Sequence, residues 1–155
     1  APIGGDGVEE ALDQADRLLT GFLEEVVNFY NPPQGKVILG GFSQGGLMAY
    51  RGLFSNPNRF LGIAALSAIV PDANNIEELQ PSCLGKPIFA CHGTGDTLIP
   101  VNAARRGVEI LRAKGYDPDY KEYSMGHEIT PNVIGDLTGW LHKVAAPAVL
   151  DSSHE

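Results

Sequence analysis

Three side chains that can act together on a carbonyl carbon occur along the chain in the order serine, aspartate, histidine. They are Ser43, Asp96 and His127, and each follows a segment that the sequence predicts to be a strand. A neutral imidazole can take the proton of a serine hydroxyl, and a carboxylate can hold that imidazole in the required tautomer. We therefore expect acyl transfer, with Ser43 as nucleophile, Asp96 as orienting acid and His127 as general base.

The segment around Ser43, Gly41-Phe42-Ser43-Gln44-Gly45, has the form G-x-S-x-G between a predicted strand and a predicted helix. Glycines on either side leave room for a tight turn that lifts the hydroxyl clear of the sheet. The backbone N–H of Gln44 would then lie at a helix N-terminus, where it can donate to a developing oxyanion. The alternative interpretation is a glycine-rich turn with an inert serine.

The other two residues also have structural interpretations. An aspartate in a glycine-rich turn, such as Asp96, commonly forms the turn itself, and a single histidine after a strand commonly has no chemical role. The catalytic interpretation rests on the coincidence of Ser, Asp and His at the exits of successive strands, which is the α/β-hydrolase order. We interpret His92 as a residue that packs or hydrogen-bonds within its turn, and Asp136 as a surface residue.

The elements that must position these residues follow from hydrophobic periodicity. Apolar residues at helical spacing predict a helix over residues 6–30, which Asn31-Pro32-Pro33 ends. Short runs rich in branched residues predict strands buried on both faces, and a tyrosine-rich alternation predicts a more exposed edge strand. The predicted strands are 36–42, 61–66, 86–91 and 116–123, and the further helices are 44–54, 102–114 and 131–144.

Strands and helices therefore alternate along the chain. This alternation predicts the α/β class, with a mostly parallel sheet of about four strands flanked by helices. In such sheets ligands bind at the carboxyl ends of the strands, where the three candidate residues lie. We expect one domain over residues 1–145 and a flexible C-terminal tail over residues 146–155.

Composition bears on partners and location. The chain has 155 residues, a formal net charge of -8 at pH 7 and no cluster of basic residues, so we expect no binding to nucleic acid. Its two cysteines, Cys83 and Cys91, form no C-x-x-C pair, so we expect neither a metal site nor a disulfide framework. Apolar runs are shorter than the ~18 residues of a membrane span, and we expect a cytoplasmic location.

The segment Leu39–Gly46 closely resembles the nucleophile segment of the phospholipase/carboxylesterase family of α/β-hydrolases, which includes the acyl-protein thioesterases. Residues 92–100 and 123–127 are similar to the aspartate and histidine loops of that family, Trp140-Leu141 matches its closing helix, and the resemblance extends from about residue 8 to residue 145. It implies a reduced α/β-hydrolase fold with the same three catalytic residues. It also implies carboxylic esters or acyl thioesters as substrates, and no metal or organic cofactor.

The resemblance also implies a part that this sequence does not contain. Family members carry strands ahead of the first helix, and a His-Gly-rich loop among them supplies the second oxyanion donor. Three explanations stay open: another backbone N–H, for which Gly4-Gly5 is a candidate; a weaker activity; or a fragment. Without those strands, residues 36–42 form an exposed apolar edge, and we expect a homo-dimer or larger assembly through this strand.

Apolar residues near the strand ends are candidates for the acyl site, with ordinary core packing as an equal alternative. They are Ile69, Val70, Leu98, Ile99 and Met125. The chain has no room for an elaborate lid, so we expect short acyl chains to be preferred. The rival to an enzyme is a non-catalytic binding or assembly module that keeps the hydrolase fold without a complete oxyanion hole.

Overall fold

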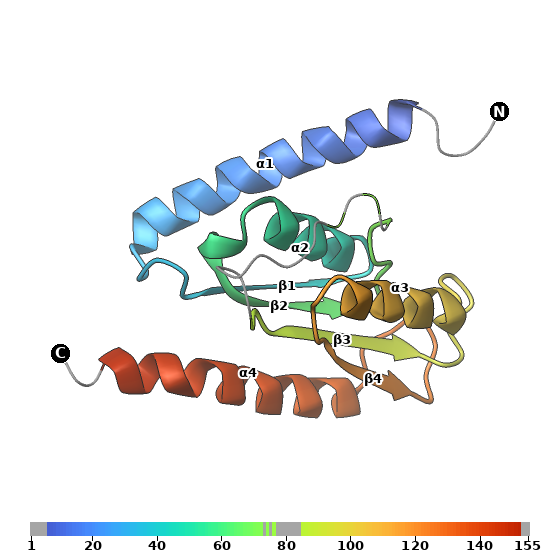
Figure 1. Ribbon diagram of the computed structural model, residues 1–155. Coiled ribbons are helices and arrows are strands. Elements are labelled where there is room, and N and C mark those ends of the chain that lie inside the picture. Colours follow the sequence, from blue (N-terminus) through green and yellow to red (C-terminus); the bar gives the residue numbers. More distant parts are fainter. Residues whose placement is uncertain (1–5, 73, 75, 77–84, 153–155) are drawn as a thin grey trace. The chain divides into compact units, whose positions relative to one another are not determined.

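The computed structural model describes residues 6–72, 74, 76 and 85–152 (Figure 1). Its internal contacts divide the chain into two compact units, Ala1–Pro33 and Gln34–Glu155, which are described separately. The single domain predicted over residues 1–145 stays a prediction. None of the helices in the described part of the chain combines the length and hydrophobicity that a bilayer span requires.

The first unit contains one helix, α1 (Asp6–Tyr30), which has the predicted bounds. The chain leaves this helix at Asn31, whose φ of 49° lies in the left-handed region. The N–H of Asn31 donates to the carbonyl of Val27 at 2.7 Å, which closes the last turn. Pro32 and Pro33 follow and cannot continue the helix, because proline has no N–H to donate.

The second unit is built on a parallel sheet of four strands in the order β1-β2-β3-β4. The strands are β1 (Val37–Phe42), β2 (Phe60–Leu66), β3 (Ile88–Gly93) and β4 (Asp119–Tyr123). The predicted α/β class and the predicted parallel sheet are thereby confirmed. Consecutive strands are neighbours and parallel, so the carboxyl ends of all four strands lie at the same end of the sheet.

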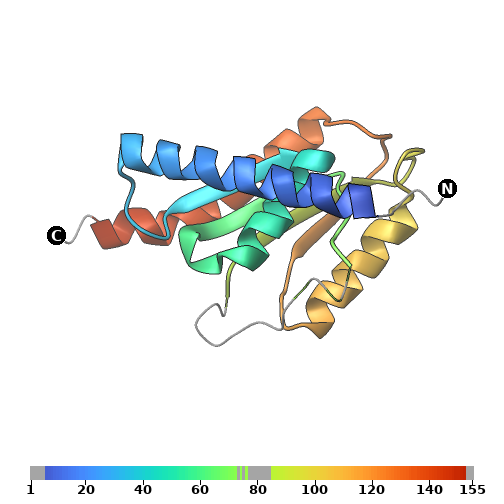
Figure 2. The ribbon, with the colours of Figure 1, turned by 90° about the horizontal axis from the view of Figure 1, so that it is seen from above.

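Helices cover both faces of this sheet (Figures 1 and 2). The crossover helices α2 (Gln44–Ser55) and α3 (Val101–Ala113) lie on one face, and α4 (Pro131–Ser152) lies on the other. A short 3-10 turn, η1 (Pro57–Arg59), leads from α2 into β2. Right-handed crossovers between neighbouring parallel strands place α2 and α3 on the same face, whereas α4 follows the last strand and covers the opposite face.

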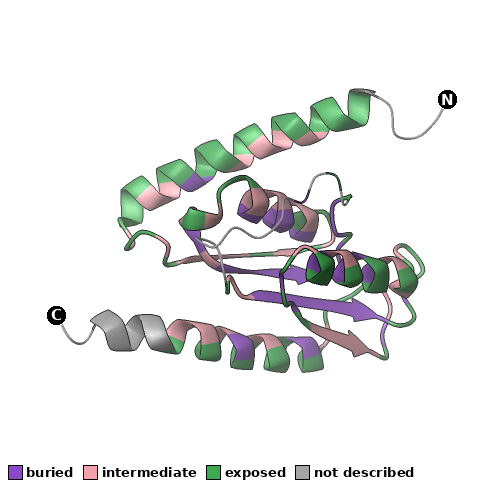
Figure 3. Ribbon diagram, in the orientation of Figure 1, coloured by how far each residue is buried: buried purple, intermediate pink, exposed green. Residues whose placement is uncertain are grey.

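Burial differs between the central and the outer strands (Figure 3). Strand β3 is buried at every residue and β2 at all but one, whereas β1 and β4 are mostly half-buried. The burial on both faces predicted for residues 36–42 is therefore wrong, because β1 lies at the edge of the described sheet. The edge position predicted for residues 116–123 is confirmed for β4.

The core beneath α4 joins that helix to the two central strands. Its buried members are Ala64, Leu66, Phe89, Cys91, Met125, Val133 and Trp140. The rings of Phe89 and Trp140 pack with centroids 5.8 Å apart. The helix continues to Ser152, so the predicted end at Val144 is wrong; Ala145 and Ala146 are strong helix formers. The flexibility predicted for residues 146–155 stays a prediction, and residues 153–155 lie outside the described part.

An ion pair ties the edge strand β4 to α3. The guanidinium of Arg105 donates to both carboxylate oxygens of Glu122 at 2.8 Å, and the Tyr120 hydroxyl donates to the same carboxylate at 2.7 Å. The hydrogen bond from Arg105 lowers the pKa of Glu122 from 4.5 to about 2, against the opposing effect of burial. A carboxyl group with a lowered pKa stabilises the fold above its unfolded-state value, and that contribution is lost as the pH falls.

We expect Glu122→Gln to reduce the acid sensitivity of folding. Between pH 5 and pH 2 the free energy of unfolding should fall by about 1–2 kcal/mol less in the variant, a figure discounted because Arg105 is half exposed. Urea unfolding at several pH values measures this difference. Parallel pH profiles for the two proteins would contradict the role given to this ion pair.

Candidate active site

Ser43 lies at a sharp turn between β1 and α2. Its backbone has φ 57° and ψ -116°, an unfavourable conformation for a residue other than glycine. The Ser43 N–H donates to the carbonyl of Leu66 at 2.8 Å, and the Ser43 carbonyl accepts from Gly46 and Leu47 at 3.0 and 3.2 Å. Hydrogen bonds to β2 and within α2 therefore hold this strained turn, as in a nucleophile elbow.

Close backbone approach explains two of the glycines around the turn. A Cβ on Gly41 would lie 2.2 Å from the carbonyl carbon and oxygen of Gly45, and a Cβ on Gly46 would lie 2.5 Å from the Cβ of Ala68. A Cβ on Gly45 meets nothing within 4 Å. The sequence argument is thus correct for Gly41 and wrong for the side chain of Gly45, and it missed Gly46.

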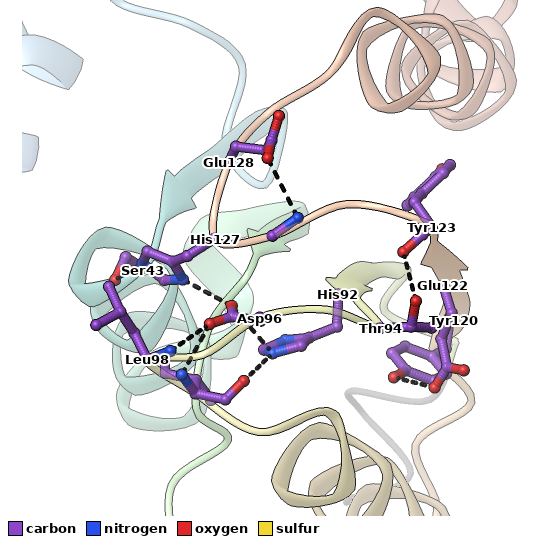
Figure 4. A network of polar contacts seen from close by, with 12 residues as sticks. Ser43, His92, Thr94, Asp96, Leu98, Tyr120, Glu122, Tyr123, His127 and Glu128 are labelled. Atoms are coloured by element: carbon purple, nitrogen blue, oxygen red, sulfur yellow. Dashed lines mark hydrogen bonds and ion pairs between the residues drawn. The ribbon is translucent and has the colours of Figure 1, made fainter.

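The three candidate residues are brought together at the carboxyl ends of β1, β3 and β4 (Figure 4). His127 Nε2 lies 2.9 Å from Ser43 Oγ, and His127 Nδ1 lies 2.7 Å from Asp96 Oδ2. The Asp96 side chain is fully buried, whereas the imidazole of His127 is 14% exposed. The carboxylate is therefore sealed inside the protein while the base remains accessible beside the serine.

Backbone contacts hold the loop after β3 against the loop after β4. The N–H groups of Thr94 and Gly95 donate to the carbonyls of Tyr123 and Met125 at 2.9 and 3.0 Å. A Cβ on Gly93 would lie 2.4 Å from the Met125 carbonyl oxygen, so the backbones of the two loops are in direct contact. This contact sets the spacing between the segment that carries Asp96 and the segment that carries His127.

The charge state of Asp96 follows from its surroundings. Burial raises the pKa of Asp96, but hydrogen bonds from the Ile99 N–H, from His127 and from the Leu98 N–H together hold it below its usual range. Both N–H groups donate to Oδ1, at 2.8 and 2.9 Å. An ionised carboxylate only accepts, so His127 must donate from Nδ1 and present the lone pair of Nε2 to the Ser43 hydroxyl.

Two further residues lie close to this network. His92 Nε2 lies 2.7 Å from the Ile99 carbonyl oxygen, which agrees with the predicted turn hydrogen bond, and 3.3 Å from Asp96 Oδ2, a contact that sequence reasoning missed. The ring of Phe42 lies 4.9 Å from that of His127 and is partly exposed. Sequence reasoning placed Phe42 in the strand and in the family-like segment before the serine, and did not assign it a contact with His127.

The sequence profile of the phospholipase/carboxylesterase family matches residues 6–145. The chain belongs to this family. Acyl-protein thioesterase 1 of Cryptococcus neoformans is 29% identical over 150 residues, covering 87% of this chain and 61% of that protein. The carboxylesterase SOBER1 of Arabidopsis thaliana is 27% identical over 145 residues, covering 92% and 61%.

Solved structures show the same fold. A carboxylesterase of Bacillus cereus matches with a TM-score of 0.77 at 22% identity, covering 88% of this chain and 63% of that one. SOBER1 of Arabidopsis thaliana matches with a TM-score of 0.71 at 23% identity, covering 93% and 67%. The chain spans between about half and three fifths of the length of the first curated relatives it matches, 49% and 61% in two cases.

The residues predicted to line an acyl site in this family member divide into two groups. Val70 and Met125 are buried, Val70 against Gly107 of α3 and Met125 in the core beneath α4, so the alternative of core packing applies to them. Ile69 and Leu98 are 51% and 73% exposed and stay candidates. Ile99 is half-buried, and both polar groups of its backbone are hydrogen-bonded within the Asp96 turn.

Only one of the two candidate oxyanion donors lies within the described residues. Gln44 is the first residue of α2, so its backbone N–H lies at the helix N-terminus next to Ser43, as predicted. Gly4-Gly5, the candidate for a second donor, lies outside the described residues. Cys83 also lies outside them, and Cys91 is a buried free thiol in β3.

Two neighbouring glycines provide a matched test of the elbow. We expect Gly41→Ala to destabilise the protein by about 1–3 kcal/mol, because the new methyl group overlaps backbone atoms that cannot move aside. Gly45→Ala should be neutral or gain up to about 1 kcal/mol, because its Cβ is unobstructed on a helix. Chemical denaturation of both variants measures the contrast, and equal stabilities would contradict this account of the turn.

Proposed function

We propose that this protein hydrolyses carboxylic esters or acyl thioesters through an acyl-enzyme on Ser43. The observation that carries the proposal is the chain of contacts from Asp96 through His127 to the Ser43 hydroxyl, at 2.7 and 2.9 Å. Its relatives include proteins named acyl-protein thioesterase and carboxylesterase, which supports the same class of substrate. The acyl group would be transferred to the serine and then to water.

In the first step, the Ser43 oxygen attacks the carbonyl carbon while His127 Nε2 takes the hydroxyl proton. The ionised Asp96 stabilises the imidazolium that forms, and the Gln44 N–H donates to the negative oxygen of the tetrahedral intermediate. His127 returns the proton to the departing alcohol or thiol. Water then enters, His127 removes its proton, and collapse of the second intermediate releases the acid and restores Ser43.

The partial exposure of His127 suits this sequence of steps. An imidazole that is 14% exposed can meet both a substrate and a water molecule, while the fully buried Asp96 keeps its hydrogen bond out of competition with solvent. A second oxyanion donor would add about 100- to 1000-fold to turnover. Gly4-Gly5 stays the candidate within this chain.

Exposed apolar side chains close to the three residues favour an apolar acyl group. The Phe42 ring packs beside His127, and Leu98 lies on the side of the network where Ser43 and His127 lie (Figure 4). With Ile69, these side chains would contact an acyl chain at the surface, because the inward-facing Val70 and Met125 are already packed. An open surface of this kind favours short acyl chains over long ones.

The rival hypothesis is a binding or assembly module with the same fold and no turnover. A cytoplasmic location and assembly of two copies along the β1 edge also stay predictions. Neither bears on the chemistry proposed for Ser43.

A fluorophosphonate probe separates the enzyme from the module. We expect the wild-type protein to be labelled and to hydrolyse p-nitrophenyl acetate, and Ser43→Ala to lose both properties. Asp96→Asn should lower kcat by about 10⁴-fold, as in the Ser-His-Asp proteases, because the imidazole adopts the wrong tautomer. The control is Ser55→Ala, which removes an exposed serine of α2 bonded only to its own helix. Labelling that survives in Ser43→Ala would rule out Ser43 as the nucleophile.

Acyl preference is tested with a series of matched substrates. We expect kcat/KM for acetyl and butyryl esters to exceed that for octanoyl esters, because the apolar residues beside His127 lie on the surface rather than in a deep channel. Oxygen esters and thioesters with the same acyl group, assayed in parallel, then determine which bond is preferred. Better cleavage of octanoyl than of butyryl esters would contradict the open surface proposed here.

A further inference from the structure

His92 is a fully buried titratable residue that the proposed mechanism leaves without a task. It lies near the end of β3, pairs in register with Glu122 of β4, and is 0% exposed. An imidazole removed from water needs hydrogen-bond partners, because an unmet polar group in the interior is costly. The partners of His92 therefore indicate why a histidine occupies this position.

The contacts of His92 fix its tautomer. Nε2 lies 2.7 Å from the Ile99 carbonyl oxygen and 3.3 Å from Asp96 Oδ2. The Ile99 carbonyl oxygen only accepts, so Nε2 carries the hydrogen and donates it to that oxygen, with Asp96 Oδ2 as a close neighbour. Nδ1 is buried without a hydrogen-bond partner in the part of the chain that the structure describes, so a second hydrogen there would have no acceptor.

These contacts connect Asp96, Ile99 and His92 to one another. The Ile99 N–H donates to Asp96 Oδ1 at 2.8 Å, and the carbonyl of the same residue accepts from His92. Two imidazoles flank Oδ2, that of His127 at 2.7 Å and that of His92 at 3.3 Å (Figure 4). His92 thus holds the turn whose N–H groups orient the carboxylate.

We propose that His92 is a positioning residue whose Nε2–H, donated to the Ile99 carbonyl, holds the 96–99 turn, and through it Asp96, in the geometry that His127 requires. This inference rests on the proposed function and adds a residue to that same site. Removing the donor leaves the Ile99 carbonyl short of a hydrogen bond, and the turn relaxes. The cost falls on proton transfer through His127 rather than on substrate binding, because His92 is buried beneath the site.

Methionine and glutamine provide a matched pair of replacements. The two side chains are nearly equal in shape and length, but only glutamine ends in an amide N–H that can replace Nε2–H. We expect His92→Met to lower kcat by about 10- to 100-fold, the range found for outer partners of metal-bound histidines, with KM nearly unchanged. His92→Gln should recover most of the loss. A residue that only filled space would not distinguish the two.

Nuclear magnetic resonance provides a readout that does not need turnover. The proton on His127 Nδ1, shared with Asp96, should give a strongly downfield signal in the wild type and in His92→Gln. We expect this signal to shift upfield or vanish by exchange in His92→Met. Ile88→Val is the control for general destabilisation, because it trims a buried residue at the opposite end of β3 and should leave both kcat and the signal unchanged.

Each outcome bears on a definite claim. Equal kcat values and equal signals in the methionine and glutamine variants would overturn the role of His92. A wild-type protein that shows the downfield signal but neither ester turnover nor fluorophosphonate labelling would overturn the proposed function, while the signal still tests His92. If His92→Met does not fold, His92→Asn replaces it, since its shorter amide cannot reach the Ile99 carbonyl and should behave as methionine does.

Discussion

The carboxylate of Asp96 is a negative charge that must be satisfied inside the protein. Two backbone N–H groups, from Leu98 and Ile99, donate to one of its oxygens, and His127 donates to the other. These bonds outweigh the cost of burial and keep the pKa of the carboxyl low. The ionised form then determines which nitrogen of His127 carries hydrogen and which faces Ser43. The proton transfer proposed for this site depends on the carboxylate keeping its position.

That position is set mainly by main-chain contacts. The loops after β3 and β4 touch at Gly93 and Met125, where no side chain fits between them, and the chain around Ser43 is equally tight where Gly41 approaches the backbone of Gly45. A parallel sheet places the carboxyl ends of β1, β3 and β4 at the same end of the sheet. The main-chain contacts then limit the loops that carry the three residues to small shifts. The hydrogen-bond distances at the three candidate residues depend on both levels of organisation.

Much of this arrangement could be predicted from local patterns. The G-x-S-x-G segment and the order Ser43, Asp96, His127 identified the three residues, because each signal lies within a few positions of a recognisable strand. The direction in which apolar residues at strand ends face could not be predicted. Val70 and Met125 turn into the core although their composition suited a binding surface equally well.

Other features depend on contacts between distant segments. A side chain at position 46 would collide with Ala68, which follows β2, and no residue close to Gly46 in the sequence indicates this contact. His92 meets Asp96 only because the chain folds back after β3. The length of α4 was underestimated, because the segment after Val144 was interpreted as a flexible tail, whereas the helix continues to Ser152.

The backbone and the side chain of Leu98, in the 96–99 turn, have separate roles. Leu98 gives its backbone N–H to the carboxylate, whereas its side chain is 73% exposed. Every amino acid except proline supplies the same N–H. The side chain at this position is therefore free to vary under selection, or in a designed library, without disturbing the acid. In the proposed enzyme, replacing the side chain at position 98 would change the contact with an acyl group while leaving in place the N–H that holds Asp96.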